Sequence, residues 1–356
     1  MIMRPGARRV IMHIEYPEYY NKFHCLAGDC PDTCCKDWEV DVDEDTFYYY
    51  KVQEGELGKK LEQCLVEDGD LKYIPMKKDG SCPFLTEGKL CEICSCLGEE
   101  GLSQVCQEYP RYYMGIGHYE QVDLSLSCME VGRLLFTQAG PVRYEKSEND
   151  EEAWETLSDT DQKRLTEIRR LRDSMIASLQ ENDGSREPAI CILPDAKGDE
   201  RLRRILRQLD VLDSESGILL EEIEESYEEI RNREAAFREK YKELLERLFT
   251  KFAVYLVFRY TLDSYYEGNL EKEQRFWNRS LRLLFLMCVN YERKEGAFGV
   301  GAMIRMAEHF SRQIEHSDEN VERMKQEREK EFFDGNFPDF PKKTAGSQDS
   351  TNVVGW

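Results

Sequence analysis

The chain has 356 residues and a formal net charge of −22, with 71 Asp and Glu residues against 49 Lys and Arg residues. This balance argues against nucleic acid and anionic membranes as partners, because both attract basic surfaces. No apolar run reaches the roughly 18 residues of a membrane helix and no secretory signal is visible, so we expect a cytoplasmic protein.

The first 140 residues predict short elements. Residues 38–43 alternate in polarity and predict a strand, after which Asp43 can cap a helix. Residues 112–126 have strand character, and residues 128–136 predict a helix.

The composition changes after residue 141 and becomes charged with helical periodicity. Residues 142–185 are predicted to be helical, with Asp159 or Thr160 as a cap. Apolar residues at helical spacing then continue through three further segments, residues 219–266, 276–291 and 300–324.

These patterns predict a mainly α protein with a small, irregular α+β, Cys-rich domain at the front and a helical bundle behind it. The predicted divisions are a metal-binding and catalytic domain at 15–140, a helical domain at 141–333 and a disordered tail at 334–356. We expect the helical domain to pack on the cysteine domain and to carry no chemistry of its own.

Cysteines are concentrated at the front of the chain: 11 of the 13 precede residue 129, and only Cys191 and Cys288 follow. Disulfides are rare in a reducing compartment, so a metal centre is favoured over a disulfide framework. Thiolate-only ligation suits zinc and iron–sulfur clusters alike, and the spacing does not decide between them. A single cysteine can also be a small buried hydrophobic residue.

Two common enzyme signatures are missing. A radical S-adenosylmethionine enzyme would be expected to show CxxxCxxC, but Asp37 stands where the third cysteine would be. No GxGxxG lies between a strand and a helix, so no motif supports an ordinary Rossmann methyltransferase.

Four ordered blocks between residues 16 and 136 carry a resemblance. They are CxxxxCxxxCCxxWxVxxD, CPFLxExxLC, LGEExLSxxCxxYPR and SLSC. Their order resembles the flagellin lysine-N-methylase family, within a wider group of zinc- or iron-chelating domains. Met129 departs from the family's usual proline, and the later half resembles the family only over residues 255–260.

The resemblance implies a set of metal ligands: Cys25, Cys30, Cys34, Cys35, Cys82, Cys91, Cys106 and Cys128. It favours a [4Fe-4S] cluster, with zinc as the alternative. Eight thiols allow two centres, or one centre with spare buried thiols, since one centre takes four. Cys64, Cys94 and Cys96 fall outside the pattern and are interpreted as bystanders.

The resemblance also implies the reaction, a transfer of methyl groups from S-adenosylmethionine to lysines of flagellin. Arg111 is a candidate clamp for the carboxylate of the methyl donor through its planar guanidinium, or else a partner in a structural ion pair. Tyr109 could orient the lysine amine or merely pack. The competing hypothesis is a non-enzymatic zinc- or iron-chelating interaction module. In either case we expect Cys191 and Cys288 to lie far from the other thiols.

Overall fold

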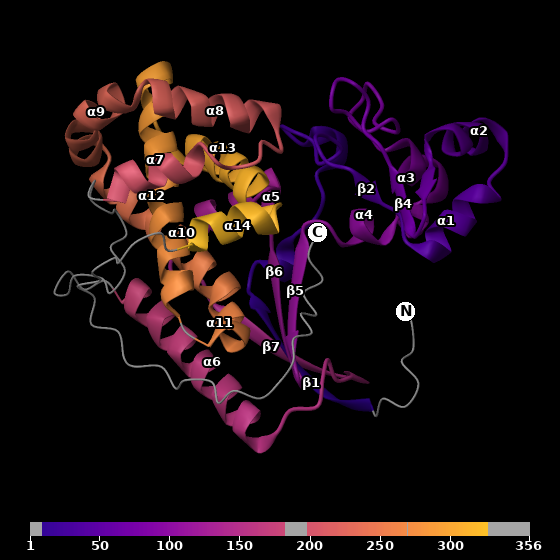
Figure 1. Cartoon of the computed structure of the whole chain (residues 1–356), viewed down its shortest axis with the longest axis horizontal. Coiled ribbons are helices and arrows are strands. Elements are labelled where there is room, and N and C mark those ends of the chain that lie inside the picture. The colour runs from indigo at the N-terminus through magenta and orange to yellow at the C-terminus, as the bar shows by residue number, and fades with distance from the viewer. Residues whose placement is uncertain (1–8, 182–197, 269, 327–356) are drawn as a thin grey trace.

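A four-stranded sheet lies at the centre of the molecule (Figure 1). The computed structural model describes residues 9–181, 198–268 and 270–326. The strand order is β5-β6-β1-β7, formed by β1 (Arg9–Pro17), β5 (Arg111–Ile116), β6 (Tyr119–Leu124) and β7 (Tyr144–Glu152). β1 is parallel to β6 and pairs antiparallel with β7 along its full length.

Two sequence predictions differ from this sheet. The predicted strand over residues 112–126 is a hairpin of β5 and β6 that turns at Gly117, where φ is 59°. Glycine is favoured there because side chains are strained at positive φ. The predicted helix over residues 142–185 is wrong in its first part, because β7 occupies residues 144–152. This acidic segment has no apolar alternation, and pairing with β1 determines its structure.

Helix α6 (Asp159–Gln180) packs on the sheet through a small core that includes Ile116, Leu165 and Ile168. Its cap is neither Asp159 nor Thr160. The hydroxyl of Ser158 instead accepts the N–H of Asp161 at 3.2 Å. The sheet thus contains strands from both sides of residue 140, where the sequence predicts a division between domains.

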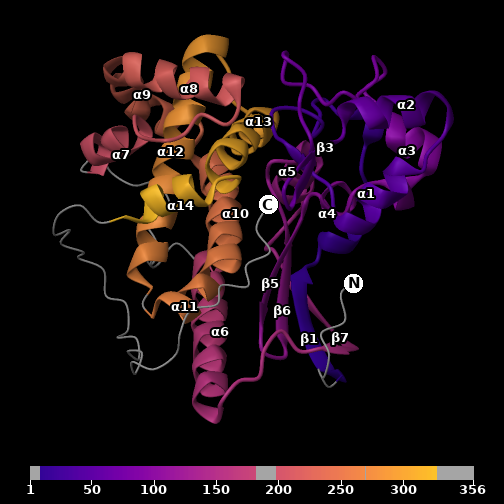
Figure 2. The same cartoon turned by 45° about the vertical axis from the view of Figure 1, so that its right-hand side comes forward.

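Residues 24–110 form what we call the cysteine lobe, drawn in violet in Figures 1 and 2. It holds a second, three-stranded sheet in the order β2-β4-β3, with short helices around it. Asp43 caps α1 as predicted, accepting the N–H of Thr46 at 2.9 Å. The elements are η2 (Ala27–Asp29), β2 (Val40–Asp41), α1 (Glu44–Lys51), α2 (Gly55–Cys64), β3 (Val66–Asp68), β4 (Leu71–Ile74), α3 (Glu92–Leu97), η3 (Glu99–Gly101) and α4 (Gln104–Glu108).

The remaining helices form the helical half, which contains most of the large core. The predicted helical segment 219–266 is divided into α8, α9, α10, a 3₁₀ turn and α11. Helix α12 and residues 251–260 of α10 are buried on nearly all sides. The predominance of helices over the two small sheets confirms the mainly α prediction. The elements are α5 (Met129–Thr137), α7 (Asp199–Leu206), α8 (Ser214–Glu225), α9 (Tyr227–Lys240), α10 (Lys242–Tyr260), η5 (Thr261–Asp263), α11 (Ser264–Glu267), α12 (Glu271–Glu295), α13 (Val300–Phe310), the π-helical η6 (Ser311–Glu315) and α14 (Asp318–Lys325).

Within the described residues, none of the helices combines the length and the apolar character needed to span a membrane. The predicted tail at 334–356 lies outside the described residues, as does Cys191.

Candidate functional site

A cavity of about 460 Å³ lies where the cysteine lobe meets α5 and α13, and we call it the cysteine cavity. A smaller cavity of about 80 Å³ adjoins it inside the lobe and adds Cys82 to a wall of shared thiols. Eight cysteines line the cysteine cavity: Cys25, Cys30, Cys34, Cys35, Cys91, Cys94, Cys106 and Cys128. The fold thus brings together thiols that span about 100 residues of chain.

Local backbone structure fixes the positions of several of these thiols. Cys128 precedes α5, and its sulfur accepts backbone N–H groups from the first turn of that helix. Two hydrogen bonds position Cys35. Its N–H donates to the hydroxyl of Thr33 at 3.1 Å, and its carbonyl accepts the N–H of Cys82 at 2.8 Å. Tight loops therefore hold the adjacent cysteines against the Cys82 segment.

Burial makes most of these thiols reluctant to ionise. It raises the pKa of Cys106 and Cys128 to about 12 and that of Cys82 to about 11. The exception is Cys35, whose pKa is lowered to about 7 by a hydrogen bond from the neighbouring thiol of Cys34. Thiolates at these positions would need a cation beside them.

The donor set of the cavity suits a soft metal, since thiolates are the ligands of zinc and of iron–sulfur clusters. Suitable ligand chemistry does not by itself place the side chains at the distances that a bound metal requires. Over residues 9–181, 198–268 and 270–326, no group of three Cys, His, Asp or Glu side chains has the spacing of a metal site. The residues fit a metal centre by chemistry and by convergence on one cavity, and ligation would require the sulfurs to move closer together.

The two predicted catalytic residues both line the cysteine cavity. Arg111 begins β5, and its guanidinium lies 5.8 Å and 5.7 Å from the ring centroids of Tyr20 and Phe23. It donates to the carbonyl of Gln107 at 3.4 Å. In the part of the chain that the structure describes, no carboxylate pairs with it. Its charge is therefore available at the cavity wall.

Tyr109 lies deeper, between the cysteine cavity and its neighbours. Its hydroxyl is 3.1 Å from the hydroxyl of Ser127. Burial, with the nearby thiols of Cys128 and Cys34, holds the pKa of Tyr109 well above its usual value. A hydroxyl in this setting donates or accepts a hydrogen bond but does not ionise.

The helical half contributes charged groups to the wall of the cavity. Arg312 pairs with Glu308 at 3.0 Å and reaches into the cysteine lobe, where it meets Asp32 at 2.9 Å. Burial raises the pKa of Glu308 to about 8, although Arg312 opposes this. Glu308 and Arg312 stand four residues apart, a spacing that places an acid and a base on one face of a helix and that is visible in the sequence.

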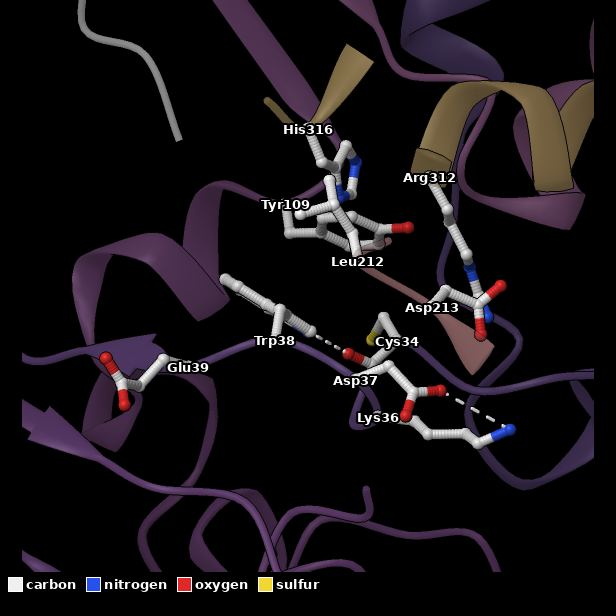
Figure 3. A pocket seen from close by; sticks show the side chains of 10 residues that line it. All are labelled: Cys34, Lys36, Asp37, Trp38, Glu39, Tyr109, Leu212, Asp213, Arg312 and His316. Atoms are coloured by element: carbon white, nitrogen blue, oxygen red, sulfur yellow. Dashed lines mark hydrogen bonds and ion pairs between the residues drawn. The ribbon is translucent and has the colours of Figure 1, made fainter. Parts of the chain in front are cut away.

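A second cleft of about 230 Å³ adjoins the cysteine cavity, and we call it the side cleft. Figure 3 shows its walls, which come from the segment after Cys34, the entry to α8 and the π-helical turn. It shares Cys34, Tyr109 and Arg312 with the cysteine cavity. Its lining residues are Cys34, Lys36, Asp37, Trp38, Glu39, Tyr109, Leu212, Asp213, Arg312 and His316.

The cysteines outside the predicted set differ in position. Cys64 packs at the edge of the lobe core and Cys96 is exposed, whereas Cys94 lines the cysteine cavity. Cys288 lies in the core of the helical half, with its sulfur 3.9 Å from that of Met303. The prediction that Cys288 lies away from the cluster is confirmed.

Comparisons with known proteins agree with the resemblance. The model of the FliB lysine N-methylase C-terminal domain matches residues 142–337. The chain is 29% identical over 121 residues to the lysine-N-methylase of Salmonella typhimurium, covering 32% of this chain and 30% of that protein. The flagellar biosynthetic protein FliU of Salmonella muenchen is also 29% identical over 121 residues, with 32% of this chain and 72% of FliU covered.

The aligned region spans less than a third of that lysine-N-methylase. No solved structure matches the chain. The family match corrects one sequence interpretation, because it extends over residues 142–337 and not only over residues 255–260. With cysteine blocks at the front and a matched domain over more than half of its length, the chain belongs to the FliB lysine N-methylase family.

Proposed function

We propose that this protein is a lysine N-methyltransferase that methylates flagellin with S-adenosylmethionine and holds a Cys-ligated metal centre, an iron–sulfur cluster. The observation that carries the proposal is the convergence of eight cysteines on one cavity of about 460 Å³ that Arg111 also lines. That volume falls within the range of about 300–1,000 Å³ typical of small-molecule sites.

The reaction needs positioning and deprotonation. The lysine ammonium first gives its proton to water, and its nitrogen then attacks the sulfonium methyl group in line. The C–N bond forms as the C–S bond breaks, and the sulfur keeps the electron pair. Ordinary lysines have a pKa near 10.4, so desolvation in a cavity would assist the first step.

In this proposal Arg111 binds the carboxylate of the methyl donor. Its guanidinium lines the cavity and is held in place by the rings of Tyr20 and Phe23. A planar fork of N–H donors suits a carboxylate better than a point charge does. Tyr109 and Glu308 would fix the shape of the cavity behind the donor.

The candidate metal ligands are Cys82 and the thiols of the cavity wall other than Cys94, which lies outside the resembled pattern. A bound metal would neutralise thiolates that burial otherwise disfavours and could anchor the amino and carboxylate groups of the donor. Because ligand binding and folding are coupled at such sites, the metal would also stabilise the cysteine lobe.

The second candidate is a chelating interaction module without catalysis. It is favoured by the small core of the cysteine lobe, which is built on few large apolar residues, among them Phe47, Leu61 and Phe84. Lobes with little apolar burial commonly rely on a structural metal.

One experiment separates the two candidates. Protein purified without oxygen is analysed for iron, zinc and absorbance near 400 nm, and is then incubated with S-adenosylmethionine and flagellin. We expect iron, visible absorbance and flagellin lysines heavier by multiples of one methyl group in the mass spectrum. Zinc without any methylation would favour the interaction module.

A further inference from the structure

The side cleft is too small for a nucleoside donor but suited to a single side chain. Its volume of about 230 Å³ lies below the range of about 300–1,000 Å³ common for cofactor-sized ligands. It is separate from the cysteine cavity but shares Cys34, Tyr109 and Arg312 with it. A group held in the side cleft would therefore lie next to a molecule bound in the cysteine cavity.

Two carboxyl groups from distant parts of the chain meet in this cleft. Asp37 follows the adjacent cysteines, and its N–H bonds the carbonyl of Gly80 at 2.8 Å. Asp213 caps α8 and accepts the N–H of Ser216 at 3.0 Å. The side chains of Asp37 and Asp213 both line this one cleft of about 230 Å³ (Figure 3). Two carboxylates so placed repel unless a cation or a proton lies between them.

The two cations that line the cleft, Lys36 and Arg312, are each shared with an acid outside it. His309, which does not line the cleft, lies 3.7 Å from the carboxylate of Asp213. Lys36 lies 2.9 Å from Glu215 and 3.4 Å from Asp37. Arg312 forms an ion pair at 2.9 Å with Asp32, which does not line the cleft. The lining holds three acidic side chains, Asp37, Glu39 and Asp213, against two cations, Lys36 and Arg312.

Apolar and aromatic surface completes the cleft. The rings of Trp38 and Tyr109 have centroids 6.2 Å apart and are tilted by 31° (Figure 3). Such rings attract an ammonium group and pack against methylene chains. Leu212 adds aliphatic surface, and His316 adds no positive charge, because burial lowers its pKa to about 3.

We propose that the side cleft binds the side chain of the target lysine, its ammonium group between Asp37 and Asp213 and its methylenes against Trp38. The proposal rests on the proposed function, with the methyl donor in the cysteine cavity on the other side of Tyr109. The substrate class is thus a primary alkylammonium group carried by a polypeptide.

The first test is binding without catalysis. Saturation-transfer NMR compares Nα-acetyl-lysine methylamide with its norleucine analogue, which lacks the ammonium group, on the full-length protein. We expect wild type to bind the lysine probe and not the norleucine probe. In Asp37→Asn/Asp213→Asn, affinity for the lysine probe should fall roughly tenfold or more, as loss of a charge-assisted contact implies.

The variants are chosen to preserve the fold. Asparagine caps helices as well as aspartate does, so α8 should keep its start at position 213. Asparagine also tolerates positive φ, which is 63° at position 37. Glu225→Gln, on the exposed face of the same helix, is the matched control and should bind the lysine probe as wild type does.

The second test is kinetic, on the protein with its metal content measured. The double variant should raise KM for flagellin roughly tenfold while leaving metal content and KM for S-adenosylmethionine unchanged. Equal binding of both probes by wild type, or an unchanged KM for flagellin in the variant, would overturn the cleft assignment. Specific binding of the lysine probe without methyl transfer by wild type would instead overturn the proposed function and leave the cleft standing.

Discussion

Glu15 on β1 and Arg172 on α6 form a buried ion pair that fastens the sheet to its covering helix. Their side chains are 4% and 0% exposed, and the contact is 2.8 Å. Burial alone would raise the pKa of Glu15, but the charge and hydrogen bonds of Arg172 lower it from 4.5 to about 2. The difference between 4.5 and about 2 corresponds to roughly 3 kcal/mol of stability at neutral pH.

The sign of the pH dependence follows from the lowered pKa. The contribution is fully present above pH 4.5, the ordinary pKa, and is lost as the pH falls toward about 2. Glu15→Gln should therefore destabilise the protein by about 3 kcal/mol at pH 7, while Asp173, 2.7 Å from Arg172, remains as a carboxylate partner of the arginine. At pH 3.5 the difference between wild type and variant should be smaller by roughly 1–2 kcal/mol.

Urea unfolding followed by circular dichroism at pH 7 and pH 3.5 measures both quantities. The control is Glu148→Gln, on the same sheet, whose exposed pair with His13 should contribute less than about 1 kcal/mol. If Glu15→Gln costs less than about 1 kcal/mol at pH 7, or if its cost does not change with pH, the ion-pair reasoning is refuted.

Three further outcomes are expected. Arg111→Ala should lower methyl transfer at least tenfold with metal content unchanged, and Arg111→Lys should restore part of it; loss of metal in the alanine variant would make the arginine structural. Cys106→Ser should lower the metal content and the melting temperature of the protein, whereas Cys64→Ser should change neither, and equal loss would contradict the division between ligands and bystanders. Gly115→Ala should cost about 1–3 kcal/mol and alter tryptophan fluorescence, since the new Cβ would lie 2.0 Å from the Trp154 ring; an unchanged melting curve would contradict this contact.

The sequence predicts well the features that depend on local pattern. Asp43 caps its helix because capping requires only that its carboxylate accept a backbone N–H group two or three residues further along the chain. The apolar spacing within 276–291 identifies α12 because the pattern lies within one chain segment, although the helix is buried on nearly all sides. Cysteine order predicts the convergence of thiols, although not the presence of Cys94 in the cavity wall.

The features missed depend on distant partners. The acidic residues of β7 favour a solvated helix by composition, and only their pairing with β1 makes them a strand. The pairing of Arg312 with Asp32 joins residues 280 positions apart, so no local window contains it. The side cleft likewise forms from two distant segments, one after Cys34 and one at the entry to α8. Nothing in the sequence of either segment indicates that the two meet.

The pairing of β1 with both β6 and β7 bears on synthesis of the chain. β1 leaves the ribosome well before its longest partner, β7, which lies more than 125 residues further along the chain. Until then its edge exposes unpaired N–H and C=O groups, which can recruit strands of other chains. A nascent chain halted near residue 140 would carry most of its cysteines and this open edge together. Such a fragment should depend on chaperones more than the finished protein does.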